Sequence, residues 1–202
     1  MIHIYGDSHG RISFSGLDLS HQNHSCNSIT MFRIGRDQSI INFHPSHLGA
    51  DNILVFVYGE IDVRFHIGNQ ILHGRKEEEI IQQLVMAYFN TIKTVATSSY
   101  RHIIITSIVP PLQQEEHESL YGKITHEYPF KLSDAHRVRF RERMNSLLHQ
   151  YCQENHFIFF DPYEFYTRPD GTLKFEYSDT NVHIQENSHV LQLFKELIEN
   201  LS

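Results

Sequence analysis

The chain has 202 residues, 40% of them hydrophobic and 20% charged, which is typical of one folded domain spanning residues 1–202. Its formal net charge of −7 at pH 7, without a cluster of Lys and Arg, argues against a nucleic-acid partner. No apolar run approaches the roughly 18 residues of a membrane span. The first apolar run starts at Ile2 and a serine motif follows by residue 8, which leaves no room for a signal peptide, so we expect a cytoplasmic protein.

Short apolar runs predict five strands. Several of them are continuously apolar, as expected for strands that are covered on both faces. The runs cover residues 1–5, 28–34, 52–58, 101–109 and 156–160. Between the first two, residues 10–27 are rich in Ser, Gly, Asn and His, and we interpret them as a long loop with room for a helical turn.

Three segments have apolar residues at three- and four-residue spacing, which predicts amphipathic helices. They cover residues 76–95, 134–152 and about 186–201. Glutamates 77–79 lie in the first turn of the first helix, where negative charge suits the helix dipole, and Ser133 is expected to cap the second. We interpret residues 110–129 as a solvated loop or, since they follow a strand, as a lid over a site.

Strands that alternate with helices predict an α/β fold. We expect a three-layer α/β/α sandwich with a mostly parallel sheet of about five strands, connected by right-handed crossovers. Ligands of such sheets bind beyond the carboxyl ends of the strands. Ser8, Gly35, residues 59–64 and residues 110–111 each follow a predicted strand directly, so they should share one edge of the sheet.

A serine follows the first predicted strand on a glycine-containing turn, in residues 5–9, Tyr-Gly-Asp-Ser-His. An acid and a histidine come near the other end of the chain, in residues 179–183, Asp-Thr-Asn-Val-His. A serine hydroxyl is a weak nucleophile at neutral pH and needs a neighbouring base. We therefore expect Ser8 to be a nucleophile and His183 its base. Asp179, or alternatively a backbone carbonyl, would orient His183.

These segments resemble the sequence blocks of the SGNH (GDSL-type) hydrolases. Residues 6–8 match the nucleophile block, Gly35 stands in the place of the second block, and residues 59–62 and 179–183 stand in the places of the last two. The resemblance implies a flavodoxin-like fold and an oxyanion site that includes the backbone N–H groups of Ser8 and Gly35. The sequence is more similar to a subgroup with Gly-Glu-Ile-Asp-x-Arg-x-His in the third block, here residues 59–66, whose members are often associated with glycan assembly.

Two positions depart from the family pattern. The asparagine that donates to the oxyanion is replaced by Ile61, which donates nothing, and the loss of one such donor costs roughly 10²–10³ in rate. The acid lies four residues before His183 rather than three, because Thr180 occupies the usual position. An irregular loop can absorb one extra residue, so Asp179 remains the candidate acid.

The third block offers a replacement for the missing donor. If the chain is extended there, Asp62, Arg64 and His66 share a face. Arg64 would then stabilise the oxyanion while Asp62 positions its guanidinium. All three are candidate substrate-binding residues, although Arg64 and His66 could instead form a surface ion pair with Glu60 or Asp62. His9 is a further substrate-binding candidate, which either shapes the site or is exposed.

The histidine pairs His21-x-x-His24-x-Cys26 and His44-x-x-His47 have the spacing of metal ligands, but neither has a second cluster at zinc-site spacing. The sequence therefore predicts no metal and no other cofactor. Two cysteines are too few for a disulfide framework.

The sequence predicts a serine esterase that removes a small acyl group, most simply acetyl, from a carbohydrate or a related small-molecule ester. An O-acyltransferase in glycan assembly would use the same residues. A catalytically impaired glycan-binding module, with Ile61 as the lesion, is the third interpretation.

Overall fold

The computed structural model describes residues 1–47, 49–95, 101–125 and 128–201. A five-stranded sheet lies at its centre in the order β2-β1-β3-β4-β5, and each strand pairing is parallel. The strands are β1 (Ile2–Gly6), β2 (His21–Asn23), β3 (Ile53–Val57), β4 (His102–Thr106) and β5 (Ile158–Phe160). The expected α/β fold with a parallel sheet of about five strands is confirmed.

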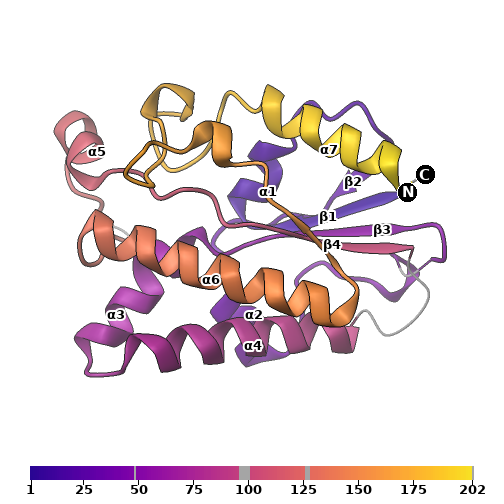
Figure 1. Ribbon diagram of the computed structural model, residues 1–202, viewed down its shortest axis with the longest axis horizontal. Coiled ribbons are helices and arrows are strands. Elements are labelled where there is room, and N and C mark those ends of the chain that lie inside the picture. Colours follow the sequence, from indigo (N-terminus) through magenta and orange to yellow (C-terminus); the bar gives the residue numbers. More distant parts are fainter. Residues whose placement is uncertain (48, 96–100, 126–127, 202) are drawn as a thin grey trace.

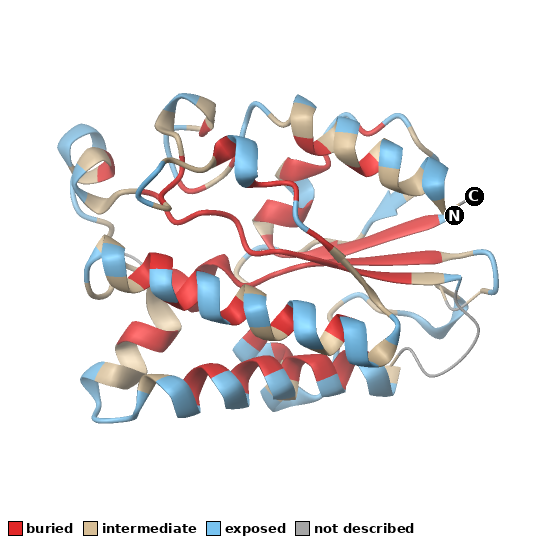
Figure 2. Cartoon of the chain, in the orientation of Figure 1, coloured by how far each residue is buried: buried red, intermediate tan, exposed pale blue. Residues whose placement is uncertain are grey.

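Helices cover both faces of the sheet (Figure 1). On one face lie α1 (Ser8–Ser13) and α7 (Ser188–Asn200), and on the other lie α2 (Met31–Asp37), α4 (Glu77–Val95) and α6 (Asp134–Asn155). All residues of β1 and β3 are buried between these layers (Figure 2). The shorter helical elements are α3 (Ile67–Leu72), α5 (Gln114–Tyr121), the π-helical turn η2 (Asp62–His66) and the 3-10 turns η1 (Pro45–His47), η3 (Glu164–Tyr166) and η4 (Phe175–Tyr177).

The three long helices lie where their periodicity predicts them. In α4 the predicted apolar stripe is buried, and Glu77, Glu78 and Glu79 occupy the first turn. Ser133 does precede α6 at the capping position, but its side chain makes no capping hydrogen bond. Its Oγ instead lies 2.7 Å from Nδ1 of His136.

The predicted second strand, residues 28–34, is wrong. Met31–Asp37 forms helix α2, because Thr30 caps it by accepting the N–H of Arg33 at 2.9 Å. The second strand of the sheet is β2 (His21–Asn23), inside the predicted loop. None of its residues is fully buried, so this edge strand has no apolar run for a sequence pattern to detect.

The segment after β4, predicted as a loop, contains helix α5 (Gln114–Tyr121). Residues 126–127 of that prediction lie outside the described residues. None of the described helices combines the length and the hydropathy needed to cross a membrane.

Candidate active site

The structure brings Ser8, His183 and Asp179 together. Ser8 is the first residue of α1, directly beyond the carboxyl end of β1. Its Oγ lies 2.8 Å from Nε2 of His183. Nδ1 of the same ring lies 2.6 Å from Oδ2 of Asp179. The hydroxyl, imidazole and carboxylate therefore stand in the order that a serine nucleophile, its base and the orienting acid require.

The turn that carries the acid accommodates its extra residue. Oδ1 of Asp179 accepts the backbone N–H groups of Asn181 at 2.9 Å and His183 at 3.2 Å. Thr180 adopts a left-handed conformation with φ of 65°, which turns the chain sharply enough to return His183 to the acid. Burial would raise the pKa of Asp179, but its hydrogen bonds with His183 and Asn181 outweigh burial and lower it.

His9, which the sequence offered as a substrate-binding residue that either shapes the site or is exposed, is turned into the protein interior. Its side chain is buried, with Nδ1 3.1 Å from Oδ1 of Asp7 and Nε2 3.1 Å from the carbonyl oxygen of Val182. Burial lowers the pKa of His9, but the Asp7 carboxylate, Glu60 and the Val182 carbonyl reverse this and raise it to about 9. The imidazolium form, in which both nitrogens donate, satisfies both neighbouring oxygens.

Asp62 does not position Arg64, because residues 62–66 form the π-helical turn η2 and not an extended chain. The Asp62 carboxylate accepts the backbone N–H groups of Met31 at 2.7 Å and Phe32 at 3.2 Å, so it caps helix α2. Burial, with smaller contributions from Asp7 and Glu60, raises the pKa of Asp62 to about 7, although the two backbone N–H groups oppose the shift.

Arg64 belongs to a buried ion pair with Glu60. Its Nε donates to Oε1 of Glu60 at 2.7 Å, and its Nη1 donates to the carbonyl of Tyr128. From the sequence, Glu60 was expected only in a surface ion pair, although the four-residue spacing of the two charges favours such a pair on a helix. Oε2 of Glu60 is buried and has no hydrogen-bond partner among the described residues.

His66 lies apart from this ion pair. Its Nε2 is 2.6 Å from Nε2 of Gln70, and its ring centroid is 4.0 Å from that of Phe32. Burial and the charge of Arg75 lower the pKa of His66 to about 4.

Gly35 is not brought to the nucleophile either. It lies inside helix α2, where a Cβ atom would meet Cβ of Ala87 in α4 at 2.8 Å. The absence of a side chain at Gly35 therefore allows α2 and α4 to pack closely. The predicted strand that would have ended at this residue is replaced by helix α2. Ile61, at the position of the missing asparagine, is a buried apolar side chain.

A cavity of about 470 Å³ adjoins the acid of the triad, a size within the usual range for small-molecule sites. Asp179, Thr180 and Asn181 contribute to its lining. The remaining lining residues belong to α5 and the segment after it, namely His117, Tyr121, Gly122, Lys123, Ile124 and Thr125. The segment interpreted as a loop or a lid therefore lines a cavity beside the triad.

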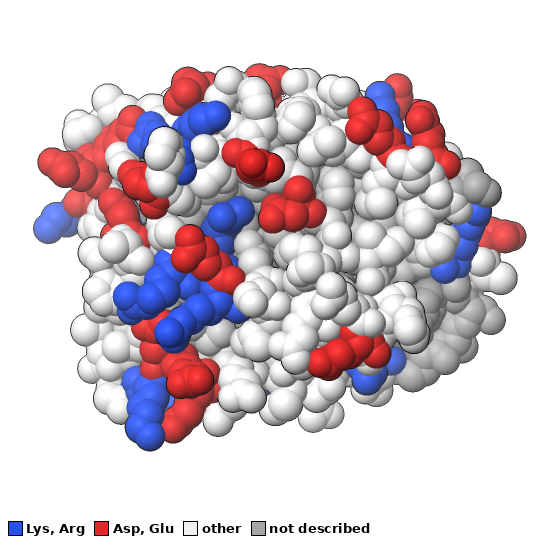
Figure 3. All heavy atoms as spheres, viewed as in Figure 1, with Lys and Arg blue, Asp and Glu red and all other residues white. Residues whose placement is uncertain are grey.

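Charges of both signs are mixed on the face of the molecule seen in Figure 3. Arg139 and Arg143 of α6 both pair with Glu77 of α4, so part of the basic surface is neutralised. This face does not present a continuous basic stripe (Figure 3). The expectation that nucleic acid is not a partner stays a prediction.

Several solved structures share this architecture. A protein from Streptococcus pneumonia matches with a TM-score of 0.65 at 17% identity, covering 100% of this chain and 83% of that one. A GDSL-like lipase from Bacteroides thetaiotaomicron matches with a TM-score of 0.63 at 13% identity, covering 100% of this chain and 88% of that one. The chain has the SGNH-hydrolase fold.

A carbohydrate acetylesterase from Sinorhizobium meliloti has a TM-score of 0.57 at 12% identity, with 100% of this chain and 99% of that chain covered. No family model and no curated protein matches the sequence. Identities this low establish the fold and leave the activity to the chemistry of the site.

Proposed function

We propose that this protein is a serine hydrolase of carboxylic esters, with Ser8 as its nucleophile. The observation that carries the proposal is the continuous series of contacts from Ser8 Oγ to His183 Nε2, at 2.8 Å, and from His183 Nδ1 to Asp179 Oδ2, at 2.6 Å. These residues come from opposite ends of the chain, 175 positions apart for Ser8 and His183, so local sequence does not account for their meeting.

In the proposed reaction, Ser8 Oγ attacks the ester carbonyl while His183 Nε2 takes its proton. Asp179 stabilises the imidazolium that forms and keeps the ring in the correct tautomer. His183 then gives the proton to the departing alkoxide, which leaves the acyl group on Ser8. A water molecule deprotonated by His183 attacks this acyl-enzyme, releases the acid and restores the serine.

The oxyanion site is the incomplete part of this mechanism. The N–H of Ser8 lies in the first turn of α1, where a backbone N–H has no partner within the helix, and we assign it as one donor. Gly35 belongs to the α2–α4 contact and Arg64 to the pair with Glu60, so the proposal gives neither a role. With Ile61 unable to donate, we expect a slower reaction than a complete site supports, by roughly 10²–10³ per missing donor.

For the substrate, we propose a small acyl ester, most simply acetyl, on a carbohydrate. The polar residues that line the cavity beside Asp179 support a hydroxyl-rich acceptor. The carbohydrate acetylesterase that shares the fold supports the same substrate class. Transfer to a second sugar hydroxyl would require the acyl-enzyme to react with that hydroxyl in place of water, and the products distinguish the two outcomes.

The test is hydrolysis of p-nitrophenyl acetate, followed by acetate release from an acetylated oligosaccharide. We expect Ser8→Ala to lose roughly 10³-fold or more in rate. The matched control, Ser15→Ala, removes an exposed hydroxyl just after α1 and should keep the full rate. A fluorophosphonate should label Ser8 in the wild type only. Equal turnover by wild type and Ser8→Ala, or an unlabelled wild type, would contradict the proposal.

A further inference from the structure

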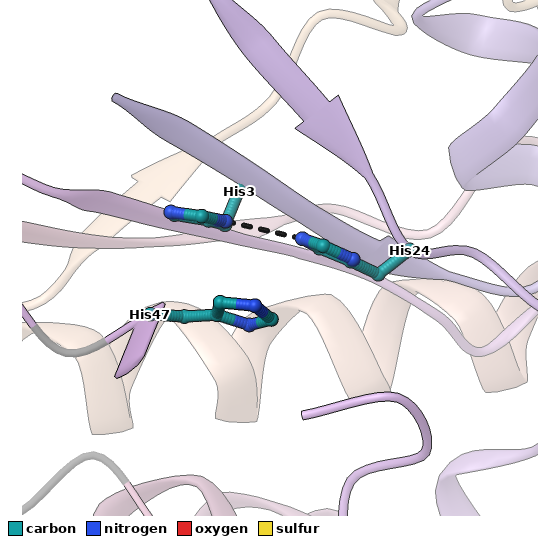
Figure 4. Close-up of side chains that lie close together, drawn as sticks. All are labelled: His3, His24 and His47. Carbon is teal, nitrogen blue, oxygen red and sulfur yellow. Dashed lines mark hydrogen bonds between the residues drawn. The ribbon is translucent and has the colours of Figure 1, made fainter. Parts of the chain in front are cut away.

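Three histidines from separate segments lie together near the β2 edge of the sheet (Figure 4). His3 belongs to β1, His24 directly follows β2, and His47 is the last residue of η1. One ring nitrogen from each lies within 4.8 Å of those from the other two. Within the described ranges, no other three His, Cys, Asp or Glu side chains meet in this way.

Two of the nitrogens already have nearly the separation of ligands on one ion. His3 Nδ1 lies 3.1 Å from His24 Nε2. Two nitrogens on a tetrahedral zinc ion, each bound at about 2.0–2.1 Å, are roughly 3.3 Å apart. An ion would take the place of the proton that the two imidazoles share.

The third ring stacks against this pair. The ring centroid of His47 is 4.5 Å from that of His3 and 4.5 Å from that of His24, with interplanar angles of 18° and 21°. The three planes are nearly parallel in Figure 4, so the rings have to turn about χ2 before their lone pairs point at one ion. This torsion ends in an sp² ring and has a broad energy well.

The backbone around these rings is fixed by hydrogen bonds. The N–H of His24 donates to the carbonyl of Ile4 at 2.7 Å, and the carbonyl of His24 accepts a hydrogen bond from Nδ2 of Asn42 at 3.0 Å. The carbonyl of His47 accepts Nδ2 of Asn52 at 3.0 Å. The ligand-bearing segments are therefore positioned before any ion binds, which reduces the entropy cost of binding.

A neighbour also orients the His47 ring. The hydroxyl of the buried Tyr5 lies 2.5 Å from Nδ1 of His47. The backbone N–H of His44 also donates to this Nδ1, at 3.4 Å. A metal-binding histidine donates from its second ring nitrogen, so on binding an ion the ring proton would move to Nδ1 and be donated to the Tyr5 oxygen, which would fix the tautomer and the ring direction. With Nδ1 engaged by Tyr5, Nε2 of His47 is the nitrogen left for an ion.

We propose that His3, His24 and His47 form a binding site for a divalent transition-metal ion of the zinc class. Imidazole nitrogens suit zinc, copper and nickel, whereas magnesium and calcium take oxygen ligands. His3 is buried and the other two are partly exposed, so water has access to complete the coordination.

The site differs from the triad in place and in effect. His3 lies near the start of β1, whereas Ser8 follows its carboxyl end. An ion here would link β1, the residue after β2 and η1, and so fasten the short edge strand to the sheet. Because the ion binds the folded protein, it should raise the unfolding temperature as its concentration rises above its Kd.

The experiment is titration of the tag-free full chain with Zn²⁺ by calorimetry, and with Co²⁺ by visible absorption, which reports the coordination geometry. We expect one equivalent of each ion to bind. His24→Gln and His47→Gln should each weaken binding by more than about tenfold, and Tyr5→Phe by roughly tenfold. The matched control, His73→Gln with His149→Gln, removes two exposed histidines and should change nothing.

Labelling of Ser8 by the fluorophosphonate and the circular dichroism spectrum verify that each variant is folded. If one ligand variant does not fold, the other carries the test, since His24 and His47 lie on separate segments. Equal affinity in wild type and ligand variants would mean adventitious binding by surface histidines and would overturn the proposal. Failure of the wild type to bind Zn²⁺ at neutral pH would overturn it equally.

Discussion

His9 donates a hydrogen bond to the backbone carbonyl of Val182, the residue directly before His183, across 3.1 Å. Its other ring nitrogen lies 3.1 Å from Asp7, directly before Ser8. One buried imidazole thus connects the turn of the nucleophile to the turn of the base, and its ring centroid is 4.7 Å from that of His183. We infer that His9 is a positioning residue for the triad.

The charge of His9 predicts a pH-dependent contribution to stability. Its pKa in the folded protein is about 9, against 6.5 for an unperturbed histidine, so folding favours its protonated form. This contribution, up to about 3 kcal/mol, is fully present below pH 6.5 and is lost as the pH rises through about 9.

We therefore expect the difference in free energy of unfolding between wild type and His9→Gln to shrink between pH 6.5 and pH 9. Urea denaturation across this range measures it. His149→Gln, at an exposed position on α6, is the control and should show no such trend. Parallel pH profiles for wild type and His9→Gln would show that His9 is not held as an imidazolium.

The role of Asp179 can be tested without disturbing its turn. An asparagine at position 179 keeps an oxygen to accept the N–H groups of Asn181 and His183, but it no longer selects the His183 tautomer that Ser8 needs. We expect Asp179→Asn to lower kcat by about 10⁴-fold. Asp170→Asn is the matched control, because Asp170 also accepts a backbone N–H two residues on, from Thr172. Full activity in Asp179→Asn would favour a backbone carbonyl as the orienting group.

Asp62 should matter for stability and not for substrate binding. Asp62→Ala removes two hydrogen bonds from the first turn of α2, and we expect it to cost about 1–2 kcal/mol in free energy of unfolding. Asp37→Ala, an exposed acid at the other end of the same helix, should cost less. Chemical denaturation gives the stabilities, and ester hydrolysis gives KM. A raised KM with unchanged stability would restore Asp62 as a substrate ligand.

The sequence predicted β1, β3, β4 and β5 and singled out Ser8, Asp179 and His183, because these features carry strong local signals. Buried parallel strands are continuous apolar runs, and Ser8 comes just after the first strand, whereas His183 lies in the irregular segment between η4 and α7. Thr180 illustrates the limit of spacing arguments, since the extra residue is absorbed by a left-handed conformation. The contact between Asp179 and His183 is made in spite of the unusual spacing.

Several of the failures come from long-range contacts that the sequence does not display. Residues 31–37 are helical partly because Asp62, from a distant segment, accepts their first N–H groups. Residues 62–66 form a π-helical turn, so the assumed alternation of side chains does not apply. His3 escaped notice as a partner of His24 and His47 because it stands alone in a strand, and only the fold brings the three rings together.

Gly35 provides a last test, which separates a packing role from a catalytic one. A methyl group at this position would meet Cβ of Ala87 at 2.8 Å, so α2 and α4 would have to move apart. We expect overpacking in Gly35→Ala to lower the free energy of unfolding by about 1–3 kcal/mol. The higher helix propensity of alanine offsets roughly 1 kcal/mol of this loss.

The double variant Gly35→Ala with Ala87→Gly moves the methyl group from α4 to α2 and removes the clash. Its loss in free energy of unfolding should therefore be smaller than the sum of the losses of the two single variants. Ala87→Gly alone completes the cycle. Urea denaturation measures the coupling, and hydrolysis of p-nitrophenyl acetate should proceed at the wild-type rate in each folded variant. A large rate loss in Gly35→Ala, with stability unchanged, would instead show that a methyl group at this position obstructs the active site.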